Sequence, residues 1–135
     1  MAIFVSLGKY KNSGLLIIRI GLGVMFIFHG YTKLLSGPQG WEGLGGSMKN
    51  VGINFFPMVW GFMAAITETF GGFLLILGLA FRPVCLLLFI TMVIVAIMHF
   101  KNGDGLSTAS HAIEVGIVFL GLTFIGPGKY SVDRK

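Results

Sequence analysis

The feature that most constrains this sequence is a series of four long apolar stretches, each nearly free of charged residues. Hydrophobic residues make up 55% of the chain and charged residues only 11%, about half the charged share of an ordinary soluble domain. A globule of 135 residues cannot bury so much apolar surface in one core, so lipid must cover part of it. The composition excludes a disordered chain, a coiled coil and a disulfide-stapled secreted module. It predicts an integral membrane protein.

Each stretch has the length of a transmembrane helix, because a hydrocarbon core about 30 Å thick needs roughly 20 residues at about 1.5 Å per residue. Apolar residues do not alternate with polar ones, as they do in the strands of a transmembrane barrel. Pro57 suits a first helical turn. We predict an all-α, four-helix integral membrane bundle forming a single transmembrane domain over residues 1–135, with helices at about 14–35, 55–80, 83–100 and 107–125.

The longest connection, residues 36–54, is rich in glycine. It carries no phosphate-binding glycine motif. We expect either a flexible outer loop or a lid over that end of the bundle, anchored by Trp41 and carrying the charge of Glu42.

The distribution of Lys and Arg predicts the orientation. One end of the predicted bundle carries six of them (Lys9, Lys11, Arg82, Lys129, Arg134, Lys135) and the other three (Lys33, Lys49, Lys101). The positive-inside rule then places both termini in the cytoplasm, for a multi-pass protein of the bacterial cytoplasmic (inner) membrane. The formal net charge of +5 fits this topology and attraction to anionic lipid. No basic cluster with interleaved aromatic residues suggests nucleic acid as a partner.

The first apolar stretch follows two lysines, as the hydrophobic part of a signal peptide does. Arg19 interrupts it, however, and the residues around His29 offer no small-residue cleavage site. We therefore expect a retained helix.

Two ionisable residues inside the predicted helices are candidate catalytic groups, Glu68 and Arg19. Glu68 follows Pro57 by eleven residues, which places it about 16 Å into its helix and near the middle of the membrane. Ionisable groups at that depth are costly and usually face the bundle interior. A helix–helix hydrogen bond or ion pair would explain Glu68, and so would a proton-carrying or quinone-contacting role. Arg19 is a candidate partner at a shallower depth, although it could instead reach back to the interface.

A second candidate site lies at the predicted outer end. For a quinone headgroup the candidates are His29, Lys33 and Glu114, and for a metal ion they are His29, His99, His111 and Glu114. Imidazole and carboxylate are ligands of zinc, iron and manganese, and two facing histidines could also hold a haem. Amphipathic residues at helix ends would look the same with no ligand. An inward-pointing Lys33 would weaken cation binding.

Thiol chemistry and familiar hydrolase chemistry find no support in the sequence. The single cysteine, Cys85, excludes an intrachain disulfide and a CxxC pair. Neither HExxH nor GxSxG occurs.

Several motifs together resemble the DoxX family of membrane proteins. They are the first-helix segments RIGLG (19–23) and HGYTKL (29–34), the stretch from Glu68 to Arg82, and the closing GPGKYSVD (126–133). The resemblance runs in order along nearly the whole chain. It implies that six residues occupy the family's polar positions: Arg19, His29, Lys33, Glu68, Arg82 and Glu114.

The resemblance implies a four-helix membrane protein, and some relatives are subunits of quinone-linked oxidoreductases, including the small subunit of a thiosulfate:quinone enzyme. Others are linked to membrane complexes that handle oxidative or thiol stress. We therefore expect a redox-complex subunit that contacts quinone or passes protons through Glu68, in a homo-oligomer or with other membrane subunits. The alternatives are a small-molecule or lipid carrier or channel, and a non-catalytic scaffold. The sequence does not decide whether the chain is itself an enzyme.

Overall fold

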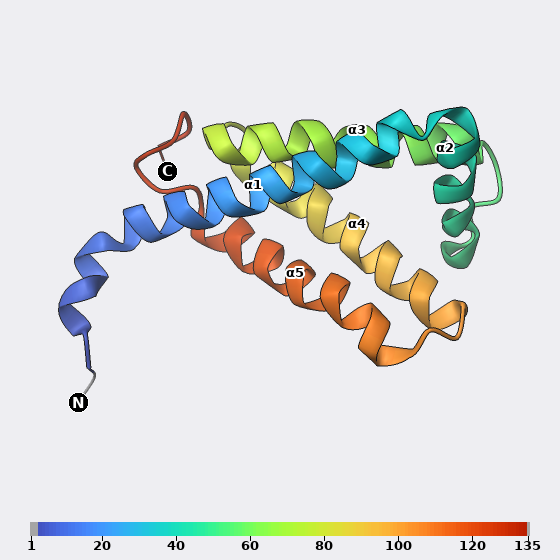
Figure 1. The fold of residues 1–135 in the computed structure, drawn as a ribbon. Coiled ribbons are helices and arrows are strands. Elements are labelled where there is room, and N and C mark those ends of the chain that lie inside the picture. The colour runs from blue at the N-terminus through green and yellow to red at the C-terminus, as the bar shows by residue number, and fades with distance from the viewer. Residues whose placement is uncertain (1–2, 135) are drawn as a thin grey trace.

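Four long antiparallel helices form the molecule (Figure 1). The computed structural model describes residues 3–134, and this part of the chain contains no strand. Four of its helices are long and apolar enough to cross a membrane. The all-α, four-span prediction is therefore confirmed, and the helices are α1 (Lys11–Leu35), α3 (Pro57–Leu77), α4 (Phe81–Lys101) and α5 (Gly105–Ile125).

The helices pack as two pairs, α1 with α3 and α4 with α5. Short turns after Leu77 and after Lys101 make neighbouring helices antiparallel. At the first turn, Gly78 adopts φ 68°, and the N–H groups of Gly78 and Leu79 both donate to the carbonyl of Leu74. This is the left-handed glycine motif that ends many helices. Both termini consequently lie at one end of the bundle, called here the terminal end, opposite the loop end that holds the α4–α5 turn (Figure 1).

The apolar core occupies the terminal half of the bundle. Leu75, Phe81 and Phe119 are fully buried there, from α3, α4 and α5 respectively. The rings of Phe26 and Phe119 meet edge to face, 5.1 Å between centroids, and join α1 to α5. Beyond this contact the two helix pairs diverge toward the loop end (Figure 1).

The connection that was expected to be a flexible loop or a lid is largely helical. It contains α2 (Gly37–Gly45) and the short 3-10 helix η2 (Gly46–Val51). A Cβ at Gly45 would collide with the carbonyl of Pro57, and one at Gly61 would collide with the carbonyl of Trp41. The backbones of α2 and α3 are therefore in direct contact, and packing rather than helix propensity orders this glycine-rich segment.

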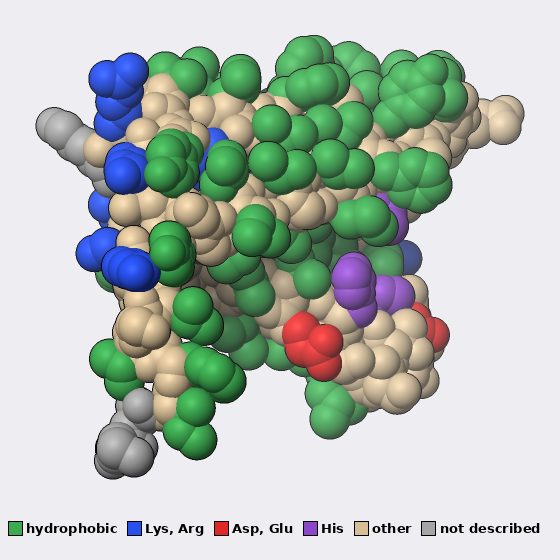
Figure 2. Space-filling view, turned by 60° about the vertical axis from the view of Figure 1, so that its left-hand side comes forward, with side chains coloured by type: hydrophobic (Ala, Val, Ile, Leu, Met, Phe, Trp, Pro, Cys, Tyr) green, Lys and Arg blue, Asp and Glu red, His purple; other side chains and the backbone are tan. Residues whose placement is uncertain are grey.

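Basic side chains gather at the terminal end, as the blue side chains of Figure 2 show. The chain enters α1 past Lys9 and Lys11, enters α4 at Arg82, and leaves α5 toward Lys129 and Arg134. A further 3-10 helix, η1 (Val5–Tyr10), precedes α1 at this end. The sixth basic residue of the predicted set, Lys135, lies outside the described residues.

Candidate functional site

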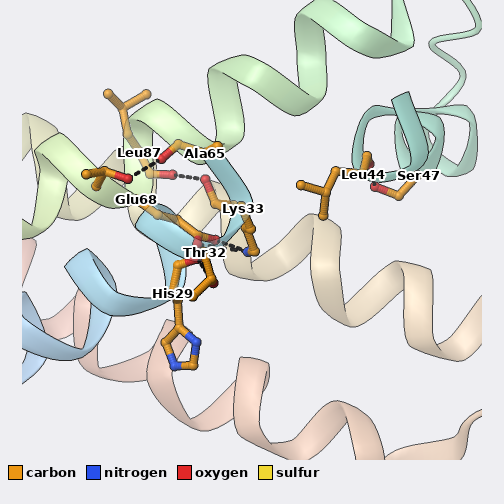
Figure 3. Close-up of polar contacts among 10 residues, drawn as sticks. His29, Thr32, Lys33, Leu44, Ser47, Ala65, Glu68 and Leu87 are labelled. Atoms are coloured by element: carbon orange, nitrogen blue, oxygen red, sulfur yellow. Dashed lines mark hydrogen bonds and ion pairs between the residues drawn. The ribbon is translucent and has the colours of Figure 1, made fainter. Parts of the chain in front are cut away.

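An ion pair between α1 and α3 forms the centre of the site (Figure 3). The ammonium of Lys33 donates to both carboxylate oxygens of Glu68, with Nζ···Oε1 2.7 Å and Nζ···Oε2 2.8 Å. The side chain of Glu68 is 2% exposed and that of Lys33 is 29% exposed. A lysine ammonium carries three N–H donors, so two serve Glu68 and the third remains available for a ligand.

A close approach of two helix backbones positions this pair. At Gly30, an added Cβ would lie 2.5 Å from the backbone nitrogen of Thr69, so only glycine fits. Two turns earlier in α1, a Cβ at Gly23 would lie 2.6 Å from the carbonyl oxygen of Gly72. Small residues at such contacts allow membrane helices to pack closely. The contact holds Lys33 and Glu68, three residues after Gly30 and one before Thr69, in fixed register.

The ion pair faces a cavity of about 150 Å³ between the two helix pairs. Its lining comes from α1 (Phe26, His29, Lys33), α3 (Glu68), α4 (Met92, Val95) and α5 (His111, Ala112). A cavity of roughly this volume accommodates one six-membered ring. Apolar walls with a few convergent polar groups are typical of small-molecule sites. None of the lining residues comes from 36–54.

Two histidines complete the polar part of the cavity. His29, on α1, is half-buried and points toward the α4–α5 pair (Figure 3), with its ring edge to face against Phe26 and Phe28. His111, in the second turn of α5, is exposed and also lines the cavity. The hollow between the two helix pairs, with histidine and acidic side chains beside it, is visible in Figure 2.

Trp41 of α2 supports the end of α1 that carries Lys33. Its indole Nε1–H donates to the carbonyl of Lys33 at 3.1 Å, and its ring packs against Phe62 of α3 with 4.8 Å between centroids. The α2 segment therefore braces Lys33 from outside the cavity.

Arg19 is not near Glu68 but belongs to a second cluster at the terminal end. It is 1% exposed and donates to four backbone carbonyls. Two belong to the last turn of α3 (Nε to Leu75, 2.9 Å; Nη2 to Ile76, 2.7 Å) and two to the C-terminal segment (Nη1 to Pro127 and to Tyr130, both 3.0 Å). Its charge is complemented by the negative end of the α3 dipole. No carboxylate among residues 3–134 forms an ion pair with it.

The C-terminal segment closes this cluster. The carboxylate of Asp133 accepts from the N–H groups of Ala80 and Phe81, at 3.1 and 2.8 Å, and so caps the start of α4. The N–H groups of Val132 and Asp133 donate back to the carbonyls of Leu77 and Gly78. We call this arrangement, made by Arg19 and residues 127–133, the terminal latch.

The proposed metal ligands are not brought together. His99 pairs with Asp104 in the α4–α5 turn, Nδ1···Oδ2 2.9 Å, and does not line the cavity. Glu114 is exposed and is likewise absent from the lining. Within the described part of the chain, no three His, Cys, Asp or Glu side chains are close enough to hold a metal ion. Of the expected quinone-site residues, the cavity contains His29 and Lys33 but not Glu114.

The sequence interpretation missed the partner of Glu68. Arg19 was considered because both residues are charged and lie inside apolar stretches. The available signal was the spacing of His29 and Lys33, which places both on one helical face. Residue counting, however, places Lys33 about 3 Å from the end of its predicted helix and Glu68 about 16 Å from the start of its own, so the pairing depends on the offset between α1 and α3 in the structure.

Comparisons with known proteins agree with this architecture. The DoxX family model matches residues 14–101, which contain most of α1, all of α2, α3 and α4, and both members of the ion pair. The chain is 29% identical over 136 residues to a Haemophilus influenzae protein described as uncharacterized, covering 96% of each chain. It is 30% identical over 129 residues to the inner membrane protein YphA of Escherichia coli, covering 90% of this chain and 89% of that one. No solved structure matches it. The chain therefore belongs to the DoxX family of membrane proteins.

Proposed function

We propose that this protein is the quinone-binding membrane subunit of a redox complex in the bacterial inner membrane. One observation carries the proposal: a buried ion pair with an unused N–H faces an intramembrane cavity that accommodates one ring. A quinone headgroup is a six-membered ring whose carbonyl oxygens accept hydrogen bonds. Lys33 donates to one of them, and the apolar wall formed by Phe26, Met92 and Val95 packs against the ring faces.

In this proposal, protons and electrons reach the quinone by separate routes. Reduction of a quinone to a quinol consumes two electrons and two protons. Lys33 donates one proton to the carbonyl oxygen that it contacts and regains a proton from water, which also supplies the second proton through the open side of the cavity, beside the exposed His111. The electrons come from a partner subunit that carries a redox centre. This division of labour follows the resemblance to subunits of quinone-linked oxidoreductases.

Residence in the bacterial inner membrane is supported by the relative whose name places it there. Contact with a partner subunit or with further copies is part of the same proposal. The apolar outer faces of α1, α3, α4 and α5 offer such partners a lipid-facing surface, since residues such as Ile17, Phe73 and Phe124 are exposed on it.

Direct binding tests the proposal. A short-chain benzoquinone is titrated into the purified protein in lipid nanodiscs, with binding followed by calorimetry. We expect saturable binding at one site, weakened roughly tenfold or more in Lys33→Met, because a hydrogen bond from a charged donor contributes about 1.5–3 kcal/mol. Lys101→Met, which removes an exposed lysine at the end of α4, is the matched control. Absence of binding to the native protein, or equal affinity in Lys33→Met, overturns the proposal.

The expected orientation has its own test, because the only cysteine, Cys85, is fully buried. A membrane-impermeant maleimide applied to intact spheroplasts should label Lys49→Cys and not Lys129→Cys. Both sites are exposed and lie at opposite ends of the bundle. The reverse labelling pattern would place the termini outside.

A further inference from the structure

A second, entirely apolar cavity lies beside the polar one, in the groove between α4 and α5. Its volume is about 230 Å³. Phe89, Ala96 and Phe100 of α4 face Ile113, Gly116 and Ile117 of α5 across it. Two residues, Met92 and Ala112, line both cavities. The groove therefore begins where the polar cavity ends.

Small residues keep this groove open without being required by helix packing. At Gly30 and Gly72, an added Cβ would approach backbone atoms of the facing helix to 2.5 Å, so close packing demands glycine there. At Gly116 the nearest atoms to an added Cβ are Met92 Cβ at 3.4 Å and Phe89 Cδ1 at 3.8 Å, which are ordinary contacts. A methyl group would fit. Glycine at 116 therefore leaves space in the groove that a larger side chain would fill.

From this arrangement we infer that the α4–α5 groove holds the apolar chain of the ligand whose headgroup lies at Lys33 and Glu68. The inference rests on the proposed function and specifies its ligand as a quinone with a long hydrocarbon chain. The wall between headgroup and chain is formed by Met92 and Ala112. Methionine has a flexible, unbranched side chain, so Met92 can turn aside and let the chain pass between the helices.

This geometry makes chain length a determinant of specificity. A short-chain quinone uses the polar cavity alone, whereas a long-chain quinone also packs its methylene groups against the walls of the groove, where van der Waals contacts with the protein replace those with lipid. The groove is as long as the spacing from Phe89 to Phe100 on α4, about 16 Å at 1.5 Å per residue. A chain of several isoprene units can lie along it.

The test compares the affinity ratio of a long-chain and a short-chain benzoquinone between variants in the same nanodiscs. Because the lipid is the same throughout, partitioning of each quinone into the bilayer cancels when ratios are compared. We expect the ratio of long-chain to short-chain affinity to be about tenfold higher in the native protein than in a variant whose groove is filled. Gly116→Phe, which fills the groove, should lower the ratio by this factor and leave short-chain affinity within about twofold. Gly121→Phe is the matched control, since Gly121 is exposed on α5 and its Cβ would meet nothing within 4 Å.

Ala96→Leu, which narrows the groove from the α4 wall, gives a second measurement should Gly116→Phe fail to fold. A chain preference that survives both substitutions overturns the inference and shows that the chain leaves the polar cavity directly into the bilayer, with ordinary lipid filling the groove. Failure of the native protein to bind either quinone overturns the proposed function instead. The two failures are therefore distinguishable.

Discussion

Arg19 and Glu68 are both 1% exposed as whole residues, yet they differ in whether a cavity with a free hydrogen-bond donor lies beside them. Arg19 directs four of its five N–H donors to backbone carbonyls of this chain. Glu68 binds a lysine that keeps one donor free and faces a cavity. A buried charge that makes most of its hydrogen bonds within the chain and lines neither cavity holds the fold together. A buried charge beside unfilled space and an unused donor has capacity left for a ligand.

The largest effect should come from Arg19→Met, which removes the donor from four carbonyls at the terminal end. The Leu75 carbonyl keeps the N–H of Gly78 as a donor. Each buried acceptor left without a partner costs about 1–3 kcal/mol, so the other three predict a loss of several kcal/mol in the free energy of unfolding and little folded protein. Thermal unfolding in detergent, followed by circular dichroism, measures it. Arg82→Met is the control, because Arg82 also donates to two carbonyls, of Thr123 and Phe124, but is exposed. Equal losses in the two variants would contradict a special role for Arg19.

At the ion pair, removing the lysine should cost more stability than neutralising the carboxylate. Lys33→Met leaves the carboxylate of Glu68, whose side chain is 2% exposed, without a partner. The cost in unfolding free energy should approach the roughly 3–5 kcal/mol of breaking a buried pair. Glu68→Gln leaves a lysine that reaches the cavity and costs less, about 1 kcal/mol. The double variant should recover part of the loss. A double-mutant cycle on unfolding free energies supplies the coupling, and strictly additive effects would mean that the pair is not formed.

Asp133→Ala tests the remainder of the terminal latch. It removes the cap from the first two N–H groups at the start of α4, for an expected loss of about 0.5–2 kcal/mol. Any change in quinone affinity should be indirect, because Asp133 is at the opposite end from the cavity and does not line it. A matched substitution, Asp104→Ala in the α4–α5 turn, removes only the contact with His99 and should cost less. A smaller loss in Asp133→Ala than in Asp104→Ala would show that the latch does not depend on this cap.

Trp41→Phe should have the smallest effect. The ring that packs on Phe62 is retained, and only the hydrogen bond to the carbonyl of Lys33 is lost, worth about 1 kcal/mol. Hydrogen–deuterium exchange should rise selectively at the end of α1 near Lys33. Exchange that stays unchanged there would show that α2 does not brace this turn.

Most of the fold follows from the sequence, because hydropathy alone determines which segments must be buried in lipid. The depth of Glu68 follows from counting residues after Pro57. Three features did not follow. The helix α2 forms because glycines let its backbone rest on α3, which helix propensity does not report. The Lys33–Glu68 pair depends on the relative register of α1 and α3, which Gly30 sets. The closing GPGKYSVD segment is recognisable as a motif, but its contact with Arg19 links residues 108 positions apart.

The terminal latch has a mechanical consequence for the cavity. The core and the latch join both helix pairs at the terminal end, and beyond them the pairs diverge (Figure 1), with η2 also in contact with α4. Over a helix of 21 residues, about 32 Å long, one degree of rotation at the base moves the tip by roughly 0.5 Å. The hydrogen bonds around Arg19 therefore influence the separation of the two helix pairs at the cavity. A substitution at Arg19 that still folds should alter ligand affinity by changing this separation, although Arg19 does not line the cavity.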